Sequence, residues 1–167
     1  VNLYQHQAVL ESKEHKLKET IPNKWKPKSA ILWAVLAIFF GISSLLAWGV
    51  ASPVGSSPDD DYHLASIWCG QGIDSKECEI GTSETTRVVP ADLAYSICFA
   101  YNSETSGACQ GEEFNTGISG NFETARGNFA RLYPPVFYYT MNFFVGQGIE
   151  KSVLLMRLFN ILLLTTL

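Results

Sequence analysis

Charged residues are absent from positions 30–51, and cations are scarce from position 52 to position 150. A soluble domain spreads its apolar residues periodically to build one core, whereas this chain concentrates them in residues 30–51 and again from residue 136 onward. That segregation favours an integral membrane protein. The acidic middle of the chain would repel phosphates, which argues against nucleic acid as a partner.

Two kinds of binding motif are also missing. The cysteines include no closely spaced C-x-x-C pair, which a structural zinc site needs. No glycine-rich motif for cradling phosphate occurs, and no internal repeat is present. These absences disfavour a zinc module and a nucleotide-binding domain.

Residues 30–51 are predicted to form a transmembrane helix. About 20 apolar residues cross the roughly 30 Å hydrocarbon core of a bilayer. Trp33 and Trp48 lie near the two ends, where interfacial anchors are expected, and lysines precede the run while aspartates follow it. The positive-inside rule then predicts a plasma-membrane protein with a cytoplasmic N-terminus and an outside loop. A signal peptide cleaved after Gly49-Val50-Ala51 is the competing interpretation, although the apolar run is longer than a usual signal core.

Residues 1–29 are predicted to be a basic cytoplasmic arm. Leu3, Leu10 and Leu17 recur at every seventh position, which is compatible with a short amphipathic docking helix. Two intervals are weak support, so a solvated arm is the favoured interpretation.

All four cysteines fall within residues 52–152, the predicted outside loop. The compartment outside the membrane is oxidising, so disulfides are expected there. Four cysteines allow three pairings. The local pairing, Cys69 with Cys78 and Cys98 with Cys109, is favoured, and each bond would contribute about 2–3 kcal/mol in the loop-entropy model.

An acidic stretch, Ser57-Pro58-Asp59-Asp60-Asp61-Tyr62-His63, follows the predicted span closely. In one interpretation it only starts a helix, with Ser57 as N-cap, Pro58 at the first position and Asp60 completing a capping box. In the other, Asp59, Asp60 and His63 share a helix face and act as a general base or hold a divalent cation. The residues leave both interpretations open.

The chain returns toward the membrane after Tyr133-Pro134-Pro135. Residues 136–145 are aromatic-rich and too short to span, so they are predicted to form an interfacial helix. A second transmembrane helix is expected to start at residue 153 and to be cut short at residue 167, which implies a fragment of a longer protein. The predicted fold class is therefore an all-α membrane protein, the N-terminal part of a polytopic helical bundle with a helical, disulfide-containing extracytoplasmic loop.

The order of these features resembles a family of large bacterial membrane proteins, catalogued as domain of unknown function 2142. The resemblance is carried by the span, by Pro58-Asp59-Asp60-Asp61-Tyr62-His63, by the segment after Tyr133, and by Met156-Arg157-Leu158. Family members typically show Pro-Asp-Glu-x-x-His, and Asp60 stands here in place of the Glu. The stretch from Ser52 to Cys69, with the later cysteines, looks like the actinobacterial branch.

That family is similar in layout to polyprenyl-phosphate-dependent glycosyltransferases of the multi-spanning type. The resemblance implies that Asp59 or Asp60 is a catalytic base or metal ligand and that His63 supports it. It also implies that Arg157 lies near the phosphate of the lipid-linked sugar donor and that Tyr133 shapes the cavity wall. For Arg157 a snorkelling or helix-packing role is the favoured alternative, and for Tyr133 a role in helix initiation.

Two functions from different classes are therefore expected. The first is a cell-envelope glycosyltransferase-like protein that uses a lipid-linked sugar, is inactive as this fragment, and is completed by further helices of a full-length protein. The second is a non-enzymatic envelope or transport component whose acidic loop binds a partner or a cation. In both cases membrane lipid surrounds the protein.

Overall fold

The computed structural model describes residues 27–73, 77–111, 119–146 and 148–167. Most of the predicted basic arm, with its leucine repeat, lies outside the described residues. The chain divides into two units, residues 1–41 and residues 42–167, and each is considered by itself.

The first described helix, α2, spans Pro27–Ala51 and begins slightly before the expected position. Proline suits the first helical position because its missing N–H would have no partner there. Among the described residues, Ser29–Ala51 is the one helix that is long and apolar enough to cross a membrane. Large side chains of the first unit, such as Trp33 (62% exposed) and Phe40 (64%), contact little protein, as expected of a helix that lipid surrounds.

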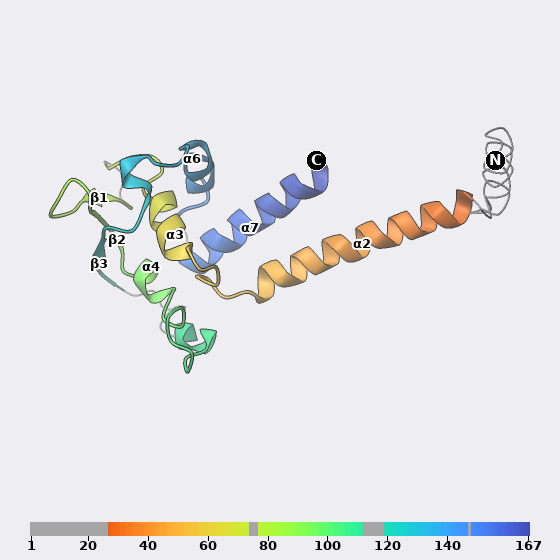
Figure 1. Ribbon diagram of the computed structural model, residues 1–167, viewed down its shortest axis with the longest axis horizontal. Coiled ribbons are helices and arrows are strands. Elements are labelled where there is room, and N and C mark those ends of the chain that lie inside the picture. The colour runs from red at the N-terminus through yellow and green to blue at the C-terminus, as the bar shows by residue number, and fades with distance from the viewer. Residues whose placement is uncertain (1–26, 74–76, 112–118, 147) are drawn as a thin grey trace, which may run out of the picture. The chain divides into compact units, whose positions relative to one another are not determined.

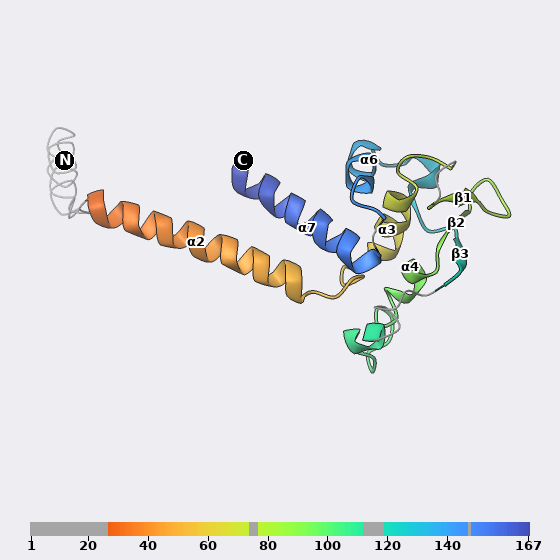
Figure 2. The ribbon, with the colours of Figure 1, turned by 180° about the vertical axis from the view of Figure 1, so that it is seen from behind.

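The core of the second unit forms around α3, Asp60–Trp68. Leu64, Ile67 and Trp68 are each at most 5% exposed, and each contributes about 1.5–3 kcal/mol by leaving water. In Figures 1 and 2, α3 lies between a small sheet and α6 (Val136–Asn142), which supplies Tyr138 and Met141 to the same core. The other core members are Val54, Val89, Leu93, Ile149, Val153 and Met156.

The described residues are mostly helical, as predicted, but a small three-stranded antiparallel sheet shows that the fold is not all-α. Its order is β1 (Glu79–Ile80), β2 (Arg87–Pro90) and β3 (Asn121–Thr124), with Ile80 opposite Arg87 and Val89 opposite Phe122. The β-branched pair Val88-Val89 favours a strand. Val89 is buried in the same core as the apolar residues of α3. Each strand has four residues or fewer, too short for a clear alternation in the sequence.

Both local disulfides are confirmed. Cys69 bonds Cys78, which joins the end of α3 to the start of the sheet, and Cys98 bonds Cys109. The second bond joins the segment after α4 (Asp92–Tyr95) to the 3-10 helix η1 (Gly107–Gln110). All four cysteines are therefore used.

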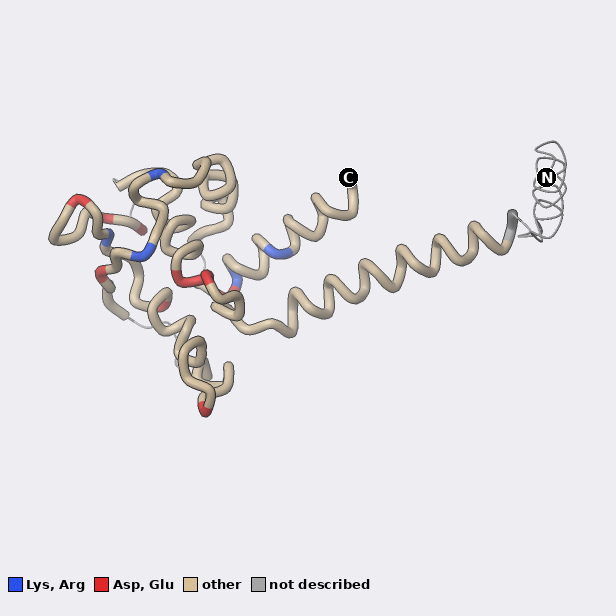
Figure 3. Tube along the Cα trace, in the orientation of Figure 1, with Lys and Arg blue, Asp and Glu red and all other residues tan. Residues whose placement is uncertain are grey.

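The two C-terminal helices differ in their bounds from the prediction. Helix α6 ends at Asn142, and α7 spans Ile149–Thr166, so it begins before residue 153. Gly148 precedes α7 with a φ of 89°, a conformation that favours glycine and lets the chain turn sharply into the helix. Helix α7 carries Glu150, Lys151 and Arg157, whereas α2 carries no charge after Lys28 (Figure 3).

Candidate functional site

The acidic stretch occupies the first turn of α3. The helix begins at Asp60 with Asp59 at the N-cap, so the prediction of Ser57 as N-cap was wrong. The backbone forms a turn first, in which Asp60 N donates to Ser57 O at 3.1 Å. One half of the expected capping box is present, because Ser57 N donates to Asp60 Oδ2 at 3.0 Å. The three aspartates therefore project from successive positions around one helix start, where the helix dipole favours negative charge.

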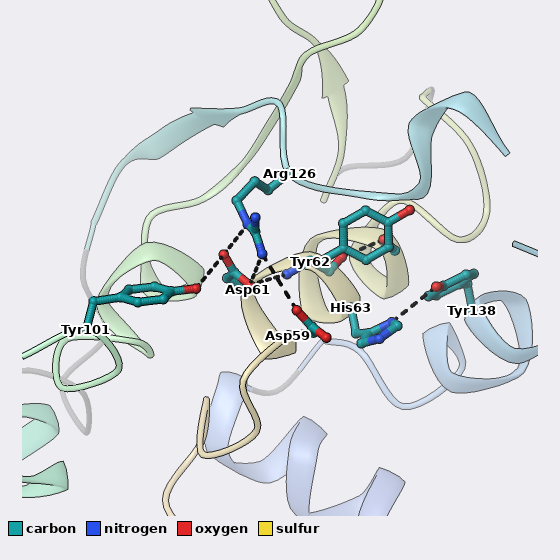
Figure 4. Close-up of polar contacts among 8 residues, drawn as sticks. Asp59, Asp61, Tyr62, His63, Tyr101, Arg126 and Tyr138 are labelled. Atoms are coloured by element: carbon teal, nitrogen blue, oxygen red, sulfur yellow. Dashed lines mark hydrogen bonds and ion pairs between the residues drawn. The ribbon is translucent and has the colours of Figure 1, made fainter. Parts of the chain in front are cut away.

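Asp61 is neutralised by Arg126, from the loop after β3 (Figure 4). Arg126 Nη2 donates to Asp61 Oδ1 at 2.9 Å, and Arg126 Nε pairs with Asp61 Oδ2. Tyr101 OH also approaches Asp61 Oδ2 at 3.5 Å. The Asp61 side chain is only 10% exposed, and its hydrogen bonds and charge raise the pKa of Arg126. This bidentate pair fixes the loop after β3 to α3.

Asp59 and Asp60 have different surroundings. The Asp59 side chain is 72% exposed, and its nearest cation is Arg126 Nη2 at 3.9 Å. Asp60 is half-buried, with one oxygen bonded to Ser57 N. Asp60 also interacts electrostatically with Arg157, from α7. Of the three aspartates, these two keep carboxylate oxygens that the described protein does not saturate.

His63 bonds a tyrosine rather than an aspartate. Its Nδ1 lies 3.1 Å from Tyr138 OH, and the two rings are stacked with centroids 6.0 Å apart (Figure 4). Among the described residues, no side-chain hydrogen bond joins His63 to Asp59 or Asp60. The predicted shared face is therefore not a direct carboxylate–imidazole contact. Burial, followed by the neighbouring tyrosine hydroxyl groups, raises the pKa of Tyr138.

Asn128 connects α3 to the segment that holds Tyr133. Its backbone N donates to Ser66 Oγ at 2.7 Å, and its side chain exchanges hydrogen bonds with Tyr133 O (2.8 Å) and Tyr133 N (2.9 Å). Tyr133 packs edge-on against Tyr62, with centroids 6.0 Å apart. Tyr133 is thus positioned beside the acidic stretch, although the residue is 55% exposed.

Arg157 caps the end of α2. Its Nη1 donates to Gly49 O at 3.1 Å and Ser52 O at 2.5 Å, and its Nη2 donates to Pro53 O at 2.9 Å. The last carbonyls of a helix lack partners within it, and a guanidinium is well suited to bond several of them. The helix-packing role is therefore present in the structure, and donors on Nη2 and Nε remain.

An open groove of about 590 Å³ lies between the end of α2 and α7. One part of its lining is apolar and includes Leu45, Trp48, Ile161 and Leu164. The other part is polar and includes Asp60 and Arg157, with Ser56, Ser57, Pro58 and Asn160. The groove therefore combines an apolar wall with one carboxylate and one guanidinium. His63, Asp59 and Tyr133 do not line it.

Metal-binding side chains are not gathered at this site. Within the part of the chain that the structure describes, no three His, Cys, Asp or Glu side chains are grouped so that they could hold a metal ion. Asp59 and Asp60 as ligands of a divalent cation stay a prediction.

A family model of predicted membrane proteins, DUF2142, matches residues 29–167. The chain belongs to the DUF2142 family. The match includes nearly all of α2, the acidic stretch, both disulfides and α7, so the resemblance inferred from Pro58–His63 and Met156-Arg157-Leu158 is confirmed at the level of the family. No curated protein and no solved structure matches the chain. This chain is therefore a predicted membrane protein of unknown function, and its described residues include one apolar helix, near the N-terminus, that could span a membrane.

Several residues of the DUF2142 site escaped sequence reasoning. Tyr138 falls in the predicted interfacial helix, and Arg126, Tyr101 and Asn128 fall in the predicted outside loop, where they were given no role. One signal was available for Arg126, because a cation in an otherwise acidic segment is expected to find a carboxylate. No comparable signal in the sequence indicates that Asp61 is the partner of Arg126, or that Tyr138 is the partner of His63.

Proposed function

We propose that this DUF2142 protein is part of a cell-envelope glycosyltransferase-like membrane protein that takes its sugar from a polyprenyl-phosphate-linked donor. The proposal places the N-terminus in the cytoplasm and residues 52–152 on the outer side of the plasma membrane. One observation carries it: the groove between α2 and α7 has an apolar wall and a charged end. A polyprenyl-phosphate sugar likewise has a long apolar chain and a charged, polar end, so its two parts match the two parts of the groove.

Asp60 is the favoured general base. It lines the groove and is half-buried, whereas Asp59 is mostly exposed and Asp61 is paired with Arg126. A base must lie within hydrogen-bond reach of the proton that it removes, which a groove-lining carboxylate can do once an acceptor hydroxyl enters. Asp59 and His63 then act as neighbours that tune the local charge, with His63 held in place by Tyr138.

Arg157 would contact the donor phosphate through its remaining N–H groups. Three of its bonds go to the backbone at the end of α2, so its guanidinium has a defined position at the groove. A fixed guanidinium binds phosphate with less loss of conformational freedom than a mobile one. Tyr133 receives no support as a donor-binding residue, because it lies outside the groove lining.

The test measures sugar transfer in native membranes, which contain any further helices that the reaction needs, supplied with a radiolabelled polyprenyl-phosphate sugar. We expect Asp60→Asn to lower the rate by about 100-fold or more, as loss of a general base commonly does. The matched control is Glu79→Gln, which removes one exposed carboxylate on β1 and should leave the rate unchanged. Transfer that persists in Asp60→Asn would reject the base assignment. Membranes without any transfer would instead favour the non-enzymatic envelope or transport component.

A further inference from the structure

A second cavity, of about 450 Å³, lies on another part of the outside segment. It is bounded by the end of α3 and the loop after it, by η2 (Asn128–Ala130), and by the start of α6. Two arginines line it, Arg87 and Arg131, together with Phe129, Pro135, Tyr138 and Ile73. No lining residue is shared with the groove between α2 and α7.

Arg87 is held in a defined position at this cavity. Its Nη1 donates to Glu84 O at 2.7 Å and Thr86 O at 2.6 Å, and its guanidinium lies 5.2 Å from the centre of the Phe129 ring. Arg87 is half-buried, and none of the other described residues forms an ion pair with it. A half-buried charge without a counter-ion is costly, so an anion entering the cavity would be stabilised.

Arg131 adds a second positive charge to the same cavity. It ends η2 with a φ of 56°, the one non-glycine residue with positive φ in the described part of the chain. This left-handed turn is strained for a residue with a Cβ, and such strain persists only where surrounding structure holds it. No described carboxylate pairs with Arg131.

The distribution of cations supports a site rather than chance. The described part of the segment between α2 and α7 contains three cations, Arg87, Arg126 and Arg131. Arg126 is neutralised by Asp61, and both others line this one cavity. In an acidic protein, such a concentration of unpaired positive charge selects anions from solution.

We propose that this cavity, with Arg87 and Arg131, binds the phosphate group of a small ligand. The remaining donors of Arg87 present a planar fork that matches a phosphate oxyanion, and Arg131 adds a second point of attachment. The apolar surface of Phe129, Pro135 and Ile73 is available to the body of the ligand. A phosphorylated sugar and a phospholipid headgroup share this chemistry, and the experiment separates them. The inference does not depend on the transfer reaction proposed above.

The test uses the 167-residue chain in detergent micelles. In the first arm, isothermal titration calorimetry measures binding of glucose 1-phosphate. In the second arm, lipid binding by the chain is compared between nanodiscs of phosphatidylglycerol and nanodiscs of phosphatidylcholine. We expect saturable binding in one arm. Arg87→Gln and Arg131→Gln should each weaken it about tenfold or more, as loss of a charge-assisted hydrogen bond does.

Lys151→Gln is the matched control, because it removes one exposed cation on α7 that lines neither cavity. It should change binding less than twofold. Because Arg87 also packs on Phe129, circular dichroism checks that Arg87→Gln still folds. Arg131→Gln removes a side chain that has no hydrogen bond to another described residue. Saturable binding in neither arm would overturn the proposal. An equal loss in Lys151→Gln would overturn it as well, since net charge alone would then explain the effect.

Discussion

At the scale of single residues, the three aspartates of the acidic stretch have three different roles. Asp61 is nearly buried and paired with Arg126, Asp60 lines the groove, and Asp59 is mostly solvated. Adjacent identical side chains diverge because successive positions on a helix point about 100° apart and meet different neighbours. The residue type alone therefore does not assign the chemistry.

Removal of the Asp61 charge should destabilise the protein. In Asp61→Asn the bidentate pair is lost and Arg126 keeps its charge beside a neutral amide, at a cost of about 1–3 kcal/mol. Thermal unfolding followed by circular dichroism should show a Tm lower by about 2–4 °C for each kcal/mol. Asp59→Asn is the control, since an exposed pair at 3.9 Å contributes about 0–1 kcal/mol. Equal Tm values for the two variants would contradict the assigned roles.

Tyr138 should make stability depend on pH in the alkaline range. Burial raises its pKa in the folded protein above the ordinary value of 10.0, so the folded state holds the phenolic proton more tightly than the unfolded chain does. Its contribution is complete below the unfolded-state pKa and is lost as pH rises through the higher folded-state pKa. Tyr138→Phe should therefore flatten the alkaline fall in the free energy of unfolding.

The control for that experiment is Tyr139→Phe, because Tyr139 is 51% exposed. It should leave the alkaline fall in stability as it is in the natural chain. Denaturant unfolding at a series of pH values, with both disulfides intact, measures the difference. A Tyr138→Phe profile that superimposes on the natural one would show that Tyr138 ionisation is not linked to folding.

At the scale of elements, α2 and α7 are joined by the hydrogen bonds of Arg157 and by a close approach at Gly49. Arg157 bonds three carbonyl groups at and beyond the end of α2, and Gly49 lets α7 approach closely, since a Cβ there would lie 3.2 Å from Ile161 Cδ1. A small residue at such a contact is typical of helix pairs in membranes.

Replacement of Arg157 should loosen this join. Arg157→Gln leaves carbonyl groups at the end of α2 without their donor, and we expect a loss of about 2–3 kcal/mol. Arg157→Lys should recover only part of it, because an ammonium group lacks the planar fork that reaches several acceptors. Thermal unfolding of the chain in detergent measures both, with Lys151→Gln as the neutral control. A Tm for Arg157→Gln equal to that of the natural chain would reject the capping role.

The elements were predicted unevenly from the sequence. The long helix and both disulfides were correct, because an uninterrupted apolar run and cysteines about ten residues apart are local signals. The sheet was missed, because β3 pairs with β2 across more than thirty residues and has no alternating pattern of its own. The predicted start of α3 was too early, because Ser57 and Asp60 first form a turn and the helix begins only after it.

At the scale of the whole molecule, the topology stays a prediction with a direct test. An epitope inserted in the exposed turn at Ser83–Thr86 should be digested by protease added to intact spheroplasts, because the proposal places this segment outside. A tag at the N-terminus should stay protected, as the lysines before the span require. Protection of the turn epitope would reverse the orientation and remove the acidic stretch from the outer surface.

The sequence by itself determined the membrane class and the apolar span, favoured the correct cysteine pairing and carried the DUF2142 resemblance, because each depends on short segments that can be recognised locally. Tertiary structure decided the partners within the site. Arg126 and Asp61 are 65 positions apart, His63 and Tyr138 are 75 apart, and Arg157 and Ser52 are 105 apart. Contacts over such separations exist only after the intervening loops have closed, and many alternative closures cost nearly the same entropy. The packed core around α3 selects one of them, and thereby selects which aspartate is paired and which one faces the groove.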